Sequence, residues 1–248
     1  MLLAKSCHDM DIMMWMKSGI KPVNITSFGG NMQFVQSKCP PNAGTRCLVD
    51  CPIEKDCLYS AKKHYIDHPD RWAFYVWDCL EHLDNPTIEQ KTESLKKDNL
   101  YGRCVWKCDN NTVDHQSLIT EFEDGSTGTF NMIGGASRGE RNIHIIGTTG
   151  EIYGNMEDAK FTIRKMDQRP GHEFSDEVID LKQIGDTAGA FGGHGGGDDR
   201  LVADFVNFQR GEKPSISCTA LEDSINGHLA VFRADRAMKE HCVINLSK

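Results

Sequence analysis

The chain has 248 residues, 39% of them hydrophobic, and a formal net charge of -8. This composition is typical of a globular protein with enough apolar material for a sizeable core. The acidic balance and the absence of a Lys/Arg run argue against a nucleic-acid-binding face. No apolar run approaches the ~20 residues that cross a bilayer. We therefore expect neither nucleic acid nor a membrane as a partner.

Ten cysteines are present, well below the density of a disulfide scaffold. The first apolar residues, Met1–Ala4, are followed at once by Lys5 and His8, a segment too short and too polar for a signal peptide. We therefore expect a cytoplasmic protein with reduced thiols.

The first elements are predicted from local patterns. The apolar run Met10–Met16 predicts a buried helix, which Gly19 ends. The alternation over residues 23–28 predicts a strand. Three helices are expected next, at about residues 57–66, 70–80 and 87–98.

Between Tyr101 and about Leu181, short alternating runs are separated by turn signals. Glu123–Ser126 has the composition of a hairpin turn. Such a meander is typical of an antiparallel sheet. The predicted strands cover residues 103–106, 117–122, 127–133, 142–146, 151–153 and 161–163.

A Gly-rich loop, residues 185–197, leads into a helix capped by Asp198 or Asp199. Five apolar side chains of that helix are expected to face the core: Leu201, Val202, Phe205, Val206 and Phe208. A second helix runs from 221 to about 238, and a closing strand covers 241–246. The order of elements predicts an α+β fold with a largely antiparallel open β-sheet and helices packed on one face. We treat residues 1–248 as a single domain.

Two glycine patterns do not predict a site. No G-x-G-x-x-G fingerprint occurs, because the loop around His194 has Asp198 where the third glycine would stand. Gly135–Gly139 matches G-x-S-x-G, but a predicted strand follows it instead of a helix. A hairpin turn is therefore favoured there over a serine nucleophile.

His8 lies in the first turn of the first predicted helix. The helix dipole disfavours an imidazolium at that end, so the ring can serve as a general base for a hydroxyl proton. From the residues alone, a surface or capping histidine is the simpler interpretation. Other polar residues that could reach a ligand are Lys5, Asp11, Tyr101 and Arg103.

Four cysteines lie close together in the sequence: Cys39, Cys47, Cys51 and Cys57. Thiolates at this density can hold zinc or an iron–sulfur cluster. The spacing lacks the two C-x-x-C pairs of a zinc ribbon. We expect no metal and keep these four residues as weak zinc candidates.

Residues 2–16, with His8, Asp11 and Trp15, resemble the segment that opens the second domain of the Gfo/Idh/MocA oxidoreductases. Further matches follow in the family order, and together they cover essentially the whole chain: Tyr101–Val105, Val113–Gln116, Ile146–Ile152 and Gly193–Asp198. The resemblance implies a C-terminal α+β domain whose N-terminal Rossmann domain, with its NAD or NADP, lies outside this chain. It also implies a sugar, inositol or related polyol as substrate, and a homo-oligomer formed through the β-sheet.

Carried over residue by residue, the resemblance makes His8 the catalytic histidine and places His194 and Asp198 in a substrate-facing loop. Ala4 replaces an aspartate that normally binds substrate, which leaves the substrate and the reaction open. Two alternatives are kept: an NAD-dependent glycoside-cleaving relative, and a non-catalytic oligomerisation or binding domain.

Overall fold

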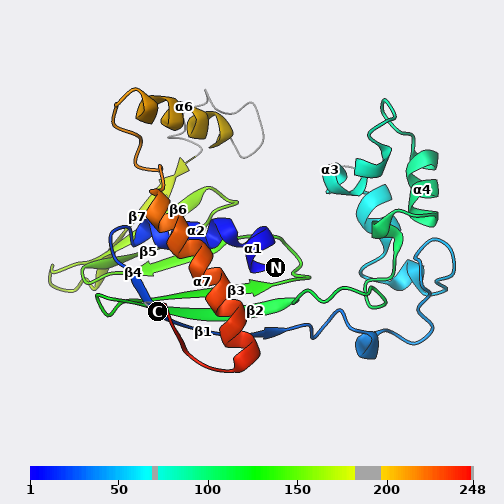
Figure 1. Cartoon of the computed structure of the whole chain (residues 1–248), viewed down its shortest axis with the longest axis horizontal. Helices are drawn as coiled ribbons and strands as arrows, with labels where there is room; N and C mark the ends of the chain where they lie inside the picture. Colours follow the sequence, from blue (N-terminus) through cyan, green and yellow to red (C-terminus); the bar gives the residue numbers. More distant parts are fainter. Residues whose placement is uncertain (69–71, 182–196, 247–248) are drawn as a thin grey trace. The chain divides into compact units, whose positions relative to one another are not determined.

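The computed structural model describes residues 1–68, 72–181 and 197–246 (Figure 1). The chain divides into two compact units. The first unit comprises Met1–Gly134 and Leu221–Lys248, and the second comprises Gly135–Ala220.

The first unit is built on a four-stranded antiparallel sheet in the order β3-β2-β1-β8. Its strands are β1 (Pro22–Gly30), β2 (His115–Phe122), β3 (Thr127–Ile133) and β8 (Ile244–Asn245). Gly125, at φ +81°, makes the turn between β2 and β3. A side chain would be strained at that φ, which explains the glycine. The hairpin predicted at this place is confirmed.

Three helices accompany this sheet: α1 (Leu2–Lys5), α2 (Cys7–Met16) and α7 (Leu221–Glu240). α7 packs on both α2 and β1. The main core lies where these helices meet the sheet. Its buried members are Leu2, Met10, Met13, Met14, Ile25, Leu118, Phe122, Ala230, Val231, Ala234, Ala237 and Ile244.

α7 buries a stripe of small side chains, among them Ala230, Ala234 and Ala237. Its larger apolar residues, such as Leu229 and Phe232, are exposed. Small side chains let a helix approach its neighbours closely, which accounts for the small-residue face of α7 where it packs on α2 and β1.

The segment between β1 and β2, residues 31–114, is called here the β1–β2 insertion. Its helices are short: η1 (Gln36–Lys38), η2 (Glu54–Asp56), η3 (Lys62–Ile66), α3 (Ala73–Val76), η4 (Asp78–Leu80), α4 (Ile88–Lys96) and η5 (Leu100–Gly102). It has a small core of its own, made by Ala61, Val76, Trp77 and Leu95.

The insertion corrects three sequence predictions. The helix at 57–66 is reduced to the π-helical turn η3, which is closed by a bond from the Asp67 N–H to the Lys62 carbonyl. The helix at 70–80 starts only at Ala73, because Trp72 has a left-handed φ of 57°. The strand at 103–106 is only an isolated bridge between Arg46 and Arg103. The third helix is confirmed as α4.

The second unit contains an antiparallel sheet in the order β4-β5-β6-β7. Its strands are β4 (Asn142–Ile146), β5 (Gly150–Asn155), β6 (Lys160–Met166) and β7 (Phe174–Asp180). Gly135–Gly139 is not a hairpin turn, because β3 and β4 belong to different sheets. β4 follows it in place of a helix, so the geometry of a serine nucleophile elbow is absent there.

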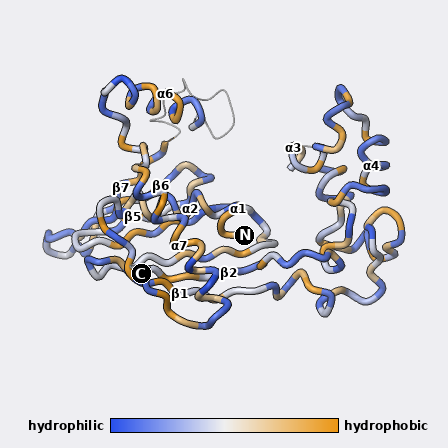
Figure 2. The backbone as a smooth tube through the Cα atoms, viewed as in Figure 1, coloured by the Kyte–Doolittle hydropathy of each residue, from blue (hydrophilic) through white to orange (hydrophobic). Residues whose placement is uncertain are grey.

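Helix α6 (Gly197–Gln209) also belongs to the second unit. The five apolar residues predicted to face the core are exposed instead. Figure 2 shows hydrophobic and hydrophilic residues alternating along α6. That part of the prediction is wrong.

The α+β class with antiparallel sheets and helices is confirmed. The single-domain assignment stays a prediction. No helix of the described residues is long and apolar enough to cross a membrane.

Candidate functional site

Three of the predicted site residues lie along one helical segment. Lys5 ends α1, and His8 is the second residue of α2. Ser6 joins the two helices at φ -94° and ψ 8°. Asp11 follows three residues after His8, and residues three apart are neighbours on a helix surface. The His8 and Lys5 side chains are exposed, whereas Asp11 is half-buried.

Asp11 is oriented by the neighbouring helix. The Ser224 hydroxyl of α7 donates to Asp11 Oδ1 at 3.0 Å. The His228 ring donates from Nδ1 to the Ser224 carbonyl at 2.8 Å. These residues line a cavity of about 10 Å³ together with Cys7 and Val231. A space of that size holds about one water molecule. Asp11 is therefore fixed in place by packing and does not line an open pocket.

Lys5 contacts an aromatic cluster that the sequence did not single out. Its Nζ donates to the Tyr75 hydroxyl at 3.3 Å and lies 4.5 Å from the centre of the Tyr75 ring. Trp72 and Phe74 both pack against Tyr75, with ring centroids 6.1 and 5.3 Å away. We call Trp72, Phe74 and Tyr75 the aromatic patch.

The aromatic patch is exposed to an unusual degree. The exposed fractions are 57% for Trp72, 85% for Phe74 and 45% for Tyr75. Exposed aromatic rings beside a cation and a hydroxyl are typical of a binding surface, because rings contact apolar faces while polar tips bond hydroxyl groups. The one local signal in the sequence is the density of aromatic residues over 72–75.

Tyr101 and Arg103 have other partners inside the β1–β2 insertion. The Tyr101 ring packs edge-on against Tyr65, with centroids 5.6 Å apart. Arg103 pairs with Asp109 at 2.6 Å, and this hydrogen bond raises the pKa of the guanidinium. Their contacts favour a structural role for both residues.

Two further predicted site residues, His194 and Asp198, come from the Gly-rich loop and the helix that follows it. His194 lies outside the described residues. Asp198 is in the first turn of α6, in the second unit.

The described strands do not form a Rossmann-type dinucleotide site. Every strand pair among them is antiparallel. A Rossmann-type site needs parallel strands joined through a helix, with a glycine-rich turn at the helix start.

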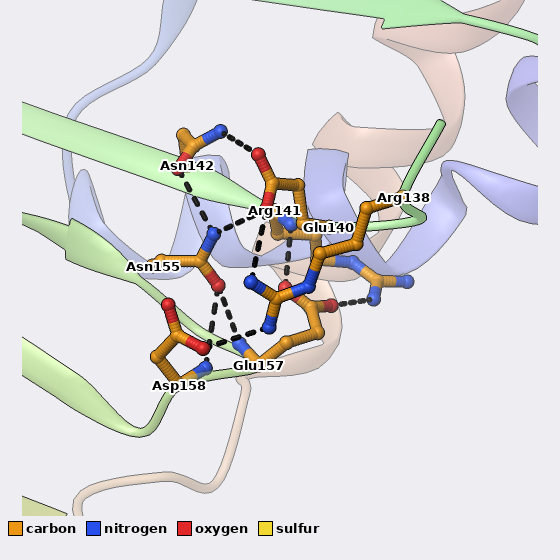
Figure 3. Close-up of polar contacts among 7 residues, drawn as sticks. All are labelled: Arg138, Glu140, Arg141, Asn142, Asn155, Glu157 and Asp158. Atoms are coloured by element: carbon orange, nitrogen blue, oxygen red, sulfur yellow. Dashed lines mark hydrogen bonds and ion pairs between the residues drawn. The ribbon is translucent and has the colours of Figure 1, made fainter. Parts of the chain in front are cut away.

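A polar network in the second unit is structural. Figure 3 shows seven charged and amide side chains around the start of β4 and the end of β5. Arg138 pairs with Asp158 at 2.7 Å, and Arg141 pairs with Glu157 at 3.1 Å. Asn155 donates to Glu140 at 2.9 Å. These pairs tie the two strand ends together.

Comparison with known proteins supports the fold. No family model and no curated protein matches the sequence. An oxidoreductase domain protein from Kribbella flavida aligns over 99% of this chain and 51% of its own, with 12% identity and a TM-score of 0.54. The chain has the fold of half of that protein.

The super-repressor mutant of Gal80p from Saccharomyces cerevisiae aligns over 100% of this chain and 50% of its own, also with 12% identity and a TM-score of 0.54. The chain thus spans about half the length of both solved structures. One of them is described as an oxidoreductase and the other as a repressor, so the fold alone does not decide between catalysis and binding.

Proposed function

We propose that this chain is the substrate-binding portion of an NAD(P)-dependent oxidoreductase of the Gfo/Idh/MocA type, acting on a sugar, an inositol or a related polyol. The order of motifs along the chain and the likeness to half of an oxidoreductase support the class. The observation that carries the proposal is local: the exposed His8 lies three residues from Lys5, which contacts the aromatic patch.

In this proposal His8 takes the proton from the hydroxyl that is oxidised and returns it in the reverse direction. A neutral imidazole is suited to that transfer near pH 7. The hydride chemistry comes from a nicotinamide cofactor held outside this chain. The residues of this chain bind and orient the substrate.

Lys5 and the aromatic patch would bind the substrate beside His8. A sugar or polyol presents apolar C–H faces to rings and hydroxyl groups to the Lys5 ammonium and the Tyr75 hydroxyl. Asp11, held by Ser224, would keep the polar face of α2 in place. His194 and Asp198 are proposed to bind further hydroxyl groups.

A homo-oligomer through the β-sheet belongs to the same proposal. Phe28, Ile119 and Ile133 are exposed, and the register places them on one face of the first sheet. An exposed apolar sheet face favours a partner.

The test starts with the coding sequence upstream of Met1. If it continues in frame, the longer protein is assayed for NADH or NADPH formation with a panel of sugars and inositols. His8→Asn should lower kcat by about 10²–10⁴-fold. Lys5→Met and Tyr75→Ala should raise KM with a smaller effect on kcat.

His82→Asn, an exposed histidine of the insertion, is the matched control and should behave as the wild type. Wild-type turnover by His8→Asn would contradict the role of His8. Glycoside cleavage without net NADH formation would favour the glycoside-cleaving alternative.

A non-catalytic binding domain is the second candidate, favoured by the equal likeness to Gal80p. Sugar binding that depends on Tyr75, without turnover by the longer protein, would support it.

A further inference from the structure

The β1–β2 insertion gathers cysteines that are distant in the sequence. Cys47, Cys51, Cys57 and Cys104 line one small cavity. Cys104 replaces Cys39 in the set suggested by sequence spacing, although Cys39 is close enough to hydrogen-bond with the Cys104 thiol. Four cysteines from two separated segments therefore line one space.

Backbone bonds hold these two segments together. The Cys47 N–H donates to the Gly102 carbonyl at 3.0 Å, and the Cys104 N–H donates to the Thr45 carbonyl at 2.9 Å. This is the antiparallel bridge between Arg46 and Arg103. The approach of Cys104 to the other cysteines is thus fixed by the backbone and does not depend on side-chain rotamers alone.

Three of the four sulfur atoms also meet backbone N–H groups. The Tyr59 N–H donates to Cys57 Sγ at 3.4 Å. The Ala61 N–H likewise hydrogen-bonds to the Cys47 sulfur, and the Trp106 N–H hydrogen-bonds to the Cys104 sulfur. Donors of this kind orient and stabilise metal-bound thiolates.

The cavity fits a single ion. Its volume is about 10 Å³, comparable with one water molecule and too small for an organic ligand. Cys104 is buried, so an ion bound beside it would be shielded from solvent. A thiol that coordinates a cation is deprotonated.

The thiols do not form a finished site as they stand. In the described part of the chain no three His, Cys, Asp or Glu side chains are arranged to hold a metal ion. Ligation at a Zn–S distance of about 2.3 Å therefore requires the thiols to rotate toward the cavity.

We propose that Cys47, Cys51, Cys57 and Cys104 bind one Zn²⁺ ion as a tetrahedral structural site. The four thiols release four protons to solvent, and the four thiolates share the ion without any change of oxidation state. Zinc is preferred to an iron–sulfur cluster because the cavity accommodates one atom. This inference goes beyond the proposed oxidoreductase function and does not depend on it.

The insertion has a structural need for such an ion. It is poor in regular structure, and only Ala61, Val76, Trp77 and Leu95 make up its buried core. Segments with so little core are commonly stabilised by a metal or by disulfides. All ten cysteines are free thiols in this structure.

The test uses the full chain, purified under reducing conditions without added chelator. Elemental analysis should give about one zinc per chain. Serine at position 47, 51, 57 or 104 should each lower the zinc content strongly. Cys79→Ser is the matched control, because Cys79 lies in the same insertion but is exposed and bonded to Ser94 and Asn99; it should keep the zinc.

A second measurement does not depend on the folding of the variants. Wild-type protein stripped of metal is titrated with Co²⁺, and absorption bands of tetrahedral cobalt thiolate should saturate at one equivalent. Iron with acid-labile sulfide would overturn the zinc assignment. Protein without metal that gives no cobalt bands, or a Cys39–Cys104 disulfide in the native protein, would overturn the site.

Discussion

Asp114 connects the two ends of the β1–β2 insertion, and its replacement by asparagine should destabilise the first unit. Its carboxylate accepts from the backbone N–H groups of Met32, Gln33 and Phe34 at 3.0, 2.6 and 3.0 Å. The His115 ring adds a bond from Nδ1 at 2.9 Å. Asp114 is itself buried.

The loss of folding free energy follows from these contacts. An asparagine would place its oxygen at Oδ2, where three N–H groups converge, and its amide would face the donors at Oδ1. One charge-assisted bond is then lost and three are weakened, at roughly 1.5–3 kcal/mol for each bond to a charged group. We expect Asp114→Asn to lower the free energy of unfolding by about 3 kcal/mol.

The stability lost in Asp114→Asn should depend on pH. Burial raises the pKa of Asp114, but the bond from His115 and the three backbone N–H groups outweigh burial and hold the pKa well below its usual range. A carboxyl group with a lowered folded-state pKa stabilises fully above its unfolded pKa of about 3.9. The difference in the free energy of unfolding between wild type and Asp114→Asn should therefore be constant near neutral pH, and it should shrink as the pH falls below about 4.

Urea unfolding followed by tryptophan fluorescence measures this difference. Asp124→Asn is the control, since Asp124 also accepts bonds in a turn but pairs with Lys17 at the surface. Exposed pairs contribute little, so this variant should change stability far less. Equal stability of Asp114→Asn and wild type at pH 7 would refute the reasoning.

Three further outcomes follow from the packing. Gly102→Ala should destabilise the insertion by about 3 kcal/mol or more, because a Cβ there would lie 1.9 Å from the Leu95 carbonyl oxygen. Gly139→Ala is the control, since a Cβ at that position meets no atom within 4 Å. Limited proteolysis should show faster cleavage of the Gly102→Ala variant only. Met10→Ala removes a fully buried side chain and should cost about 2–5 kcal/mol in urea unfolding. Arg103→Gln breaks the surface pair with Asp109 and should lower the stability measured by urea unfolding only slightly. A raised KM for the substrate would support the predicted substrate contact of Arg103.

Much of the fold could be predicted because its signals are local. The helix at Met10–Met16 follows from an apolar run, and the strands follow from alternation between turn residues such as Gly125. The pairing of β1 with β2 was less accessible, because the insertion separates them in the sequence. Periodicity identifies a strand but does not identify its neighbour.

The burial of α6 and α7 shows the limit of pattern arguments. A periodic apolar stripe such as that of α6 predicts an amphipathic helix, yet the pattern carries no information about what covers the stripe. In α7 the stripe of small residues is buried, because small side chains allow close packing on α2 and β1. The larger apolar residues Leu229 and Phe232 stay exposed.

The candidate site shows the same difference between residues that are close in sequence and residues that only the fold brings together. His8 and Asp11 were identifiable because they lie within one helical segment. Tyr75 was not, since its contact with Lys5 spans 70 positions. Cys104 joins the other cysteines through a single backbone bridge, for which no periodic pattern exists.

The proposed zinc site and the proposed substrate surface are mechanically connected. Cys47 packs on the small core that contains Val76 and Trp77, and these residues directly follow Tyr75. Removing the ion should loosen α3 and with it the aromatic patch, while His8 on α2 rests on a different core. If the chain continues upstream into an active enzyme, chelation should raise the KM for the substrate and leave kcat nearly unchanged, and added zinc should restore the original KM.

The control for that experiment is Tyr75→Ala, in which the aromatic contact is already lost. Chelation should then have little additional effect on KM, because residues acting through one contact are not additive. A fall in kcat on chelation with KM unchanged would contradict this connection. Such a result would indicate a metal close to His8 and not a structural ion in the insertion.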